Sequence, residues 1–301
     1  MSLGRATKPR WTKVLRAWLS VAVTAGLLAW VAQRVDVGEI RASLTAGNPL
    51  WWGAAVCLVP FQVLLGALRW HRVAERLALP MPLGHAVNEY GLGIVLNQIL
   101  PGGVAGDAVR VWRHKQGHGE LAAPLRAALV DRVIGHWAHL LVTFAGLVAW
   151  FKVHGEHPPT GSMTVLLCLG AFFAIVWWKP PPGFRGLVGD TRVALGRGTE
   201  WAFHGAVSVT LVGTFLLSFW LCATALGLPL GLAAFTAVPL LMLITVIPVS
   251  IGGWGLRELS AVVILASLGW SASDAVALSA AYGLANLVGA VPFLLVLGKS
   301  G

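Results

Sequence analysis

The sequence predicts an all-α polytopic membrane protein with about six crossing helices and two re-entrant helical hairpins in two inverted repeats. Three observations lead to this prediction. First, 57% of the 301 residues are hydrophobic and only 11% are charged, whereas soluble domains carry about 25% charged residues. Second, apolar segments long enough to cross a bilayer recur along the chain. Third, two shorter apolar segments each end in a proline followed by glycines.

Composition also bounds the domain organisation. No long polar linker interrupts the chain, so we expect a single integral membrane domain over residues 1–301. The longest polar-leaning gap, residues 179–205, is too short for a soluble catalytic domain, which argues against most enzymes. The basic residues behind the net charge of +10 lie beside hydrophobic segments, which favours a role in membrane orientation over a nucleic-acid partner.

Six segments are predicted to cross the membrane, because each approaches the length of about 20 mostly apolar residues that a spanning helix needs. Many of them begin or end in tryptophan, which prefers the membrane interface. The basic residues at 5–16 precede the first segment, and we interpret that segment as an uncleaved anchor because no convincing cleavage site follows it. The six segments are residues 16–32, 51–68, 133–150, 163–178, 206–226 and 275–297.

Two further apolar segments, 88–100 and 234–247, do not fit as crossings, and each ends at a helix-breaking proline. We expect each to be the first arm of a re-entrant hairpin, with second arms at 104–112 and 253–268. Both chain termini then share one side, which holds 18 Lys and Arg residues against 4 on the other. This asymmetry predicts cytoplasmic N- and C-termini in a bacterial cytoplasmic (inner) membrane.

The two hairpin segments are related by a fixed offset of 147 residues. The relation defines repeats at roughly 50–150 and 200–298, joined by the span at 163–178. An odd number of crossings precedes the second repeat, so it enters the membrane from the opposite side. Inverted repeats with broken helices are typical of secondary transporters, whose site lies between the repeats. The matched residues are Pro82-Leu83-Gly84 with Pro229-Leu230-Gly231, Ala86 with Ala233, Pro101 with Pro248, Gly106 with Gly253, and Arg110 with Arg257.

Each helix break is predicted to form half of an anion-binding site. Pro101 and Pro248 end the first arms, and the glycines that follow permit close backbone approach. The second arms then begin with free N–H groups at the positive end of a helix dipole, which suits phosphate or carboxylate. Arg110 and Arg257 add a formal charge, and guanidinium groups bind phosphate through two hydrogen bonds.

Acidic residues accompany both arginines. Asp107 lies three positions before Arg110 on the same arm, and the two are expected to pair. Arg257 and Glu258 are adjacent, and we expect each to need another partner because neighbouring helix residues do not face each other.

A polar stripe begins at Asp131 and Arg132, after which Arg132, His136, His139 and Thr143 recur on one helix face. Charged residues inside a membrane face the interior of the helix bundle, so we expect the stripe to look inward. The alternative is that Asp131 and Arg132 are interfacial and that the histidines are hydrogen-bonded core residues.

Other polar groups receive simpler interpretations. No metal and no cofactor are expected, because the pairs His114 with His118 and His154 with His157 lack a third ligand at metal-site spacing. The basic stretch at residues 69–72 is interpreted as an anchor at a helix end, with contact to anionic lipid headgroups as the alternative.

Three blocks of sequence together resemble a known family. The segments "NQILPGGVAGDAVR" (97–110), "DRVIG" (131–135) and "PVSIGGWGLRE" (248–258) are similar to signature blocks of the lysylphosphatidylglycerol synthase transmembrane-domain family. That family is the flippase-like membrane region of multiple peptide resistance factors, and the similarity covers about residues 11–297. Asp131-Arg132 stands where the family usually has Glu-Arg, which is a conservative departure.

The resemblance implies movement of an anionic phospholipid or an isoprenoid-linked lipid between membrane leaflets. The soluble aminoacyl transferase domain of fused relatives is not found in the sequence, so no synthase activity is expected. We expect an anionic membrane lipid as the partner, and a homo-oligomer stays open. The expected substrate-binding residues are Asn97, Pro101, Gly106, Asp107, Arg110, Asp131, Arg132, Pro248, Ser250, Gly253, Arg257 and Glu258.

Two other functions stay open at this point. A membrane-embedded lipid-modifying enzyme, similar to a glycosyltransferase, would use Asp107 or Glu258 as a catalytic carboxylate. A non-transporting accessory subunit would use its polar residues only to hold the bundle together. Product formation from labelled lipid would support the enzyme, and charge substitutions that lower stability without changing lipid distribution would support the accessory subunit.

Overall fold

The computed structural model describes residues 10–100, 105–115, 121–154, 162–228, 231, 238–243, 250–266 and 269–298. These residues form helices and no strand. Pro101, Pro248 and most of the segment 234–247 lie outside the described residues, so the predictions made for them stay predictions. The helices are α1 (Arg10–Ala32), α2 (Val37–Ala46), α3 (Pro49–Arg76), α4 (Leu83–Ile99), α5 (Ala105–Lys115), α6 (Ala122–His154), α7 (Ser162–Trp178), η1 (Pro182–Phe184), α8 (Arg185–Leu195), α9 (Thr199–Ala225), α11 (Leu256–Ala266), α12 (Ala272–Ala290) and η2 (Val291–Gly298).

The all-α polytopic class is confirmed. Four helices are long and apolar enough to cross a membrane, and α1 with α2 makes a fifth candidate that is bent by 92°. Helix α7 has 17 residues, so it falls just short of a comfortable span. The number of six crossings stays a prediction. The four spans are Pro49–Arg76, Ala122–Ala149, Thr199–Ala225 and Ala272–Leu295.

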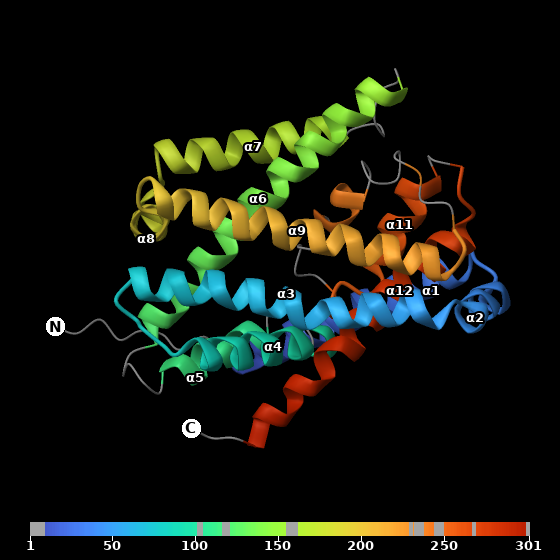
Figure 1. Cartoon of the computed structure of the whole chain (residues 1–301), viewed down its shortest axis with the longest axis horizontal. Helices are drawn as coiled ribbons and strands as arrows, with labels where there is room; N and C mark the ends of the chain where they lie inside the picture. Colours follow the sequence, from blue (N-terminus) through green and yellow to red (C-terminus); the bar gives the residue numbers. More distant parts are fainter. Residues whose placement is uncertain are drawn as a thin grey trace.

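Helices α3 and α9 run antiparallel along the centre of the bundle (Figure 1). The Asn48 backbone N–H donates to the Ala225 carbonyl oxygen at 2.7 Å. Further along, Gln62 Nε2 donates to the Thr214 carbonyl oxygen at 3.2 Å. At the other end Arg72 forms an ion pair with Glu200. The contacts pair rising numbers in α3 with falling numbers in α9, as an antiparallel arrangement requires.

Helices α4 and α5 form an antiparallel helical hairpin. Arg113 Nε donates to Glu89 Oε1 at 2.8 Å near one end, and the Gly106 N–H donates to Asn97 Oδ1 at 2.8 Å near the other. Between them a Cβ added to Gly106 would lie 2.0 Å from the Gly93 carbonyl oxygen, so only glycine permits this backbone approach. The predicted hairpin is present, and its re-entrant placement in a membrane stays a prediction.

A glycine-rich turn at residues 250–255 precedes α11. Gly252, Gly253 and Gly255 have φ angles of 55°, 80° and 81°, which L side chains rarely adopt. The turn is held on two sides: the Ile251 N–H donates to Thr24 Oγ1 of α1 at 2.9 Å, and a Cβ on Gly252 would lie 2.8 Å from the Gln98 Cα atom of α4. The tip of the second predicted hairpin therefore contacts the first hairpin.

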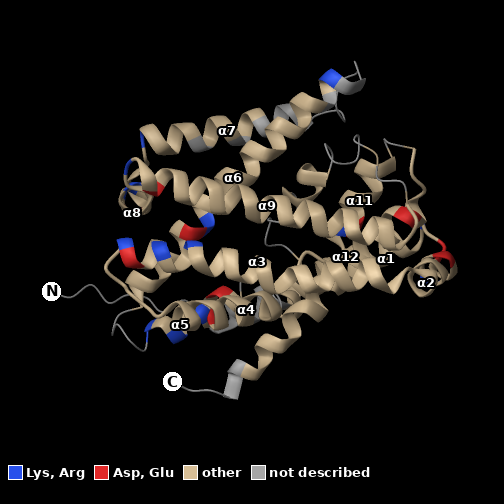
Figure 2. Cartoon of the chain, in the orientation of Figure 1, with Lys and Arg blue, Asp and Glu red and all other residues tan. Residues whose placement is uncertain are grey.

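Apolar packing holds the two ends of the bundle. One cluster joins α9, α11 and α12 around Phe219, Leu265 and Leu278. Another joins α3, α6 and α8 around Trp70 and Val130. Lys and Arg gather where α5, α8 and the C-terminal end of α3 lie, and we refer to this part as the basic end (Figure 2).

Candidate functional site

A cavity of about 370 Å³, lined by both polar and apolar side chains, lies between the two predicted hairpins. Its described lining comes from α3, α4, α5, α6, α9, α11 and α12, together with residues 238–243 and the turn at 250–255. A volume of this size suits a headgroup or a small ligand, not the acyl chains of a whole lipid. The helices that surround the cavity therefore bring together residues from both predicted repeats.

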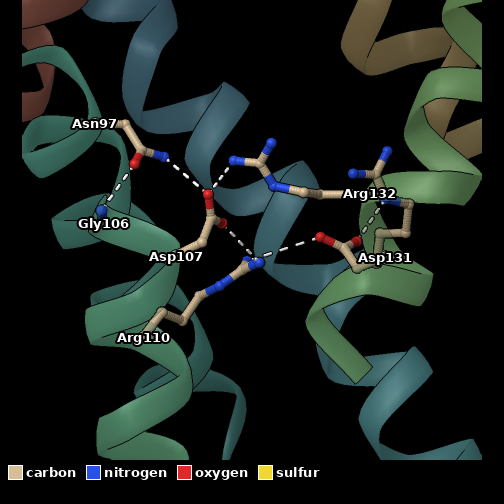
Figure 3. A network of polar contacts seen from close by, with 7 residues as sticks. Asn97, Gly106, Asp107, Arg110, Asp131 and Arg132 are labelled. Carbon is tan, nitrogen blue, oxygen red and sulfur yellow. Dashed lines mark hydrogen bonds and ion pairs between the residues drawn. The ribbon is translucent and has the colours of Figure 1, made fainter. Parts of the chain in front are cut away.

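One side of the cavity carries a network of ion pairs, which we call the first half-site (Figure 3). Arg110 Nη2 lies 3.0 Å from Asp107 Oδ1, as the three-residue spacing predicted. Arg132 of α6 pairs with the other oxygen of Asp107. Asn97 of α4 donates from Nδ2 to Asp107 at 3.0 Å and accepts from the Gly106 N–H. Asp131 lies 3.7 Å from Arg110 Nη1 and completes the network.

Arg69 of α3 also belongs to the first half-site, and the sequence-based interpretation of residues 69–72 as a surface anchor is wrong for this residue. Arg69 is only 5% exposed. Its Nε donates to Asp131 Oδ1 at 2.8 Å, and its Nη1 donates to Ser208 Oγ at 3.1 Å. Gln62 lies seven positions earlier on the same helix face and also lines the cavity, a spacing that signals an inward-facing stripe.

The second half-site contains Arg257, Glu258 and Ser279. The prediction that Arg257 and Glu258 need separate partners is wrong, because Arg257 Nη2 donates to Glu258 Oε1 at 2.9 Å. Both side chains also contact Ser279 of α12: Arg257 Nε donates to Ser279 Oγ at 3.0 Å, and Ser279 Oγ donates to Glu258 Oε1 at 2.9 Å. Glu258 lies in the first turn of α11, and its side chain reaches back to accept the Gly255 N–H at 2.6 Å. This capping geometry turns the carboxylate toward Arg257.

Each half-site places its buried guanidinium groups against a glycine or an aromatic ring. A Cβ on Gly135 would lie 2.8 Å from Arg69 Nη1, and a Cβ on Gly283 would lie 2.2 Å from Arg257 Nη2. The Arg110 guanidinium carbon lies 4.4 Å from the centre of the Trp70 ring, and that of Arg257 lies 4.5 Å from the centre of the Trp254 ring. Cation–π contacts of this kind partly compensate for the loss of water around the charge.

The polar stripe of α6 faces inward, as predicted. Asp131 is 1% exposed, and Arg132, His136 and His139 line the cavity with it. His139 Nε2 contacts the Pro239 carbonyl oxygen at 3.1 Å, and Thr143 donates to the His139 carbonyl oxygen. His139 is thus a hydrogen-bonded core residue that also reaches the cavity, so part of the alternative interpretation holds for it.

Most of the predicted binding residues lie at this cavity. Gly106 and Glu258 do not line it, but they support Asn97 and Arg257 through the hydrogen bonds described above. Pro101 and Pro248 fall outside the described residues. The eight predicted residues that line the cavity are Asn97, Asp107, Arg110, Asp131, Arg132, Ser250, Gly253 and Arg257.

Three buried polar atoms of lining residues make no hydrogen bond within the described part of the chain. They are Arg110 Nε, Ser250 Oγ and Gln98 Oε1. Buried polar atoms are normally paired with protein or with an ordered molecule, because leaving them unpaired costs free energy. Two of the three, Arg110 Nε and Ser250 Oγ, can donate, so two residues that line the cavity carry a buried donor without a partner among the described residues.

The charge of the described lining is positive. Arg69, Arg110, Arg132 and Arg257 line the cavity with Asp107 and Asp131. Glu258 lies behind Arg257 and neutralises it, which leaves an excess of one positive charge. Among the described residues no group of three or more His, Cys, Asp or Glu side chains has the arrangement of a metal site. The cavity therefore suits an anion more than a cation.

These features define a class: a multi-pass helical membrane protein with a positively charged cavity lined by helices from both halves of the chain. The sequence matches the family described as the lysylphosphatidylglycerol synthase TM region over residues 17–293. That match spans nearly the whole chain, so the protein belongs to this family. None of the curated proteins compared with the chain matches it.

Proposed function

We propose that the protein moves an anionic lipid, a phospholipid or an isoprenoid-linked lipid, between the two leaflets of a membrane. The observation that carries the proposal is the meeting of Arg110 and Arg257, from two distant segments, at one cavity with unpaired buried donors. Membership of a membrane-domain family and the apolar helices around the cavity support it. Such intramembrane charges are costly and are typical of substrate pathways.

The chemistry of the cavity suits a headgroup phosphate. Guanidinium groups present planar donor pairs that match phosphate oxygens, and the lining residues Arg110 and Ser250 each carry a donor that has no partner among the described residues. In the first half-site, Asp107 and Asp131 form ion pairs with the arginines, so no arginine there is buried without a counter-ion. An arriving phosphate would share the same donors.

The arrangement of the helices supports the proposal of two inverted repeats. Each repeat would contain a long helix, a hairpin and a second long helix: α3, α4 with α5, and α6, followed by α9, residues 238–243 with α11, and α12. Helices α3 and α9 run in opposite directions, as inversion requires (Figure 1). Rocking of one repeat against the other would open the cavity to each leaflet in turn.

We further propose a bacterial cytoplasmic membrane with both termini at the cytoplasmic side. The gathering of Lys and Arg at the basic end supports this orientation (Figure 2). The same charges would concentrate anionic lipid near the mouth of the cavity on that side.

The test is lipid flux in vesicles. Purified protein is reconstituted into phosphatidylcholine and phosphatidylglycerol vesicles with fluorescent phosphatidylglycerol, and reagent-accessible fluorescence reports transbilayer movement. We expect wild-type protein to accelerate movement, and Arg110→Ala and Arg257→Ala to abolish the acceleration. Arg41→Ala, which removes an exposed charge of α2 outside the basic end and the cavity, is the matched control and should behave as wild type. Unchanged flux in both cavity variants would contradict the site, and absence of wild-type flux for every anionic lipid tried would contradict the function.

The two other functions have weaker support. A lipid-modifying enzyme needs a carboxylate that is free to transfer a proton or attack, whereas Asp107 and Glu258 are both engaged in ion pairs. An accessory subunit does not explain why residues that line the cavity carry unpaired buried donors.

A further inference from the structure

A row of polar side chains on α9 connects the basic end to the cavity. Glu200, His204 and Ser208 recur every four residues, so they lie on one face of the helix. The rise of an α-helix places Glu200 and Ser208 about 12 Å apart along the axis. The row lies in a helix that is otherwise apolar enough to span a membrane.

The outer end of the row is open to solvent. Glu200 pairs with Arg72, whose side chain is 42% exposed. Arg72 also pairs with Glu75 at 3.0 Å, so this end is a surface cluster that exchanges protons with water.

The middle of the row is a buried histidine. His204 is 1% exposed, and its ring interacts with the Ala194 backbone at the end of α8, while no side chain among the described residues accepts from or donates to its nitrogens. Its ring packs edge-on against Phe203 at a centroid distance of 5.4 Å, which supplies no polar partner. Buried polar groups of this kind are typically satisfied by ordered water. Ionisable residues inside a membrane span mark proton or substrate pathways.

The inner end of the row reaches the ion pairs of the first half-site. Ser208 is fully buried and accepts from Arg69 Nη1, while Asp131 accepts from Nε of the same guanidinium group. The Ser208 hydroxyl and the Asp131 carboxylate therefore both accept hydrogen bonds from the same Arg69 guanidinium group. Asp131 also forms an ion pair with Arg110 at the cavity.

We propose that Glu200, His204, Ser208 and Asp131 form a proton path, and that a proton moves together with the anionic headgroup. This inference rests on the proposed lipid translocation. Water at the basic end delivers a proton to one ring nitrogen of His204, and the other nitrogen releases its proton through water and the Ser208 hydroxyl to an Asp131 oxygen. One proton enters and one arrives, which leaves His204 neutral with its proton on the other ring nitrogen. Rotation of the ring, or proton exchange between the two nitrogens through water, restores the starting tautomer.

Protonation of Asp131 changes the electrostatics of the cavity. It removes one negative charge, which releases Arg69 and Arg110 to an incoming phosphate and raises the positive excess of the cavity by one. By linkage, a proton on Asp131 strengthens anion binding and a bound anion strengthens protonation. Proton and anion therefore favour the same loaded state and cross together. The charged groups that act on His204 are Arg69 of α3, Glu200 of α9 and Asp131 of α6, while α8 contributes the Ala194 backbone.

The experiment measures proton uptake and lipid flux in the same vesicles. Phosphatidylcholine and phosphatidylglycerol vesicles contain a trapped pH-sensitive dye and fluorescent phosphatidylglycerol, with an imposed pH gradient and potassium plus valinomycin to clamp the potential. We expect wild-type vesicles to take up protons faster than protein-free vesicles, and their lipid flux to change with the gradient. We expect His204→Gln to reduce proton uptake to the protein-free rate, and His85→Gln, at the far end of α4, to leave it unchanged. Circular dichroism and thermal unfolding show whether His204→Gln is folded.

A second variant keeps the test decisive if His204→Gln does not fold. Asp131→Asn mimics the protonated carboxyl, so lipid flux should lose its dependence on the gradient. Full proton uptake by a folded His204→Gln variant, or wild-type flux that ignores the gradient, overturns the proton path and leaves the lipid proposal intact. Proton uptake that depends on His204 without any lipid flux overturns the lipid proposal instead. Wild-type proton uptake at the protein-free rate overturns the path whatever the lipid does.

Discussion

Each half-site contains a buried arginine at the cavity, but the two half-sites neutralise the charge of that arginine in different ways. In the first, three helices contribute charged groups: Arg110 shares Asp107 and Asp131 with Arg132 and Arg69. In the second, Arg257 is paired with the adjacent Glu258, and only Ser279 joins from another helix. A shared network has alternative pairings, whereas a local pair has none. The first half-site is therefore suited to respond to a ligand or proton, and the second to hold a fixed charge.

The largest expected effect is a difference in unfolding free energy between Arg257→Ala and Arg110→Ala. Arg257→Ala leaves Glu258 buried without a cation among the described residues, and breaking such a pair costs about 3–5 kcal/mol. Arg110→Ala leaves Asp107 with Arg132 and Asp131 with Arg69, so its cost should be smaller. Thermal unfolding in detergent measures the difference. Equal destabilisation of the two variants would remove the distinction between a local and a shared arrangement.

The second prediction concerns removal of both partners. Replacing the buried pair Arg257 and Glu258 with Met and Gln together should destabilise less than Arg257→Ala alone, because no charge is left uncompensated. The matched double variant in the first half-site, Arg132→Met with Asp107→Asn, should show no such rescue, since Arg110 would then lose Asp107. A double-mutant cycle on unfolding free energies tests both. Additive costs at Arg257 and Glu258 would show that the pair is not coupled.

The sequence predicted the positions of the half-sites better than their pairings. Asp107 and Arg110 were found because proline, glycine and helix-spacing rules are local and act on one segment, and Asn97 was found through the family resemblance. Arg69 was missed because its partner Asp131 lies 62 residues away, and no single-segment rule connects them. The pairing of Arg257 with Glu258 was missed because the helix-face rule does not hold in a first turn, where a side chain can turn back to cap the helix.

The third prediction compares the two glycines that lie against arginines. Gly283→Ala places a methyl group 2.2 Å from Arg257 Nη2, and the local pair gives that guanidinium little freedom to move, so overpacking should cost about 1–3 kcal/mol. Gly135→Ala meets Arg69 Nη1 at 2.8 Å, and the cost should be lower because the clash is smaller. Both costs are read from thermal unfolding. A larger effect at Gly135 would mean that the shared network is the more rigid of the two.

The smallest expected effect comes from the two serines that contact the arginines. Ser279 accepts from Arg257 and donates to Glu258, so Ser279→Ala removes two hydrogen bonds to charged groups. Ser208 accepts only from Arg69 in the described contacts, and Ser208→Ala removes one. Each bond to a charged group contributes about 1.5–3 kcal/mol at most, and neighbouring donors recover part of it. Ser279→Ala should therefore lower the unfolding free energy more than Ser208→Ala does, while only Ser208→Ala should slow proton uptake in vesicles. If Ser279→Ala slowed proton uptake as well, the two half-sites would be joined by one hydrogen-bond network instead of acting as a responsive side and a fixed side.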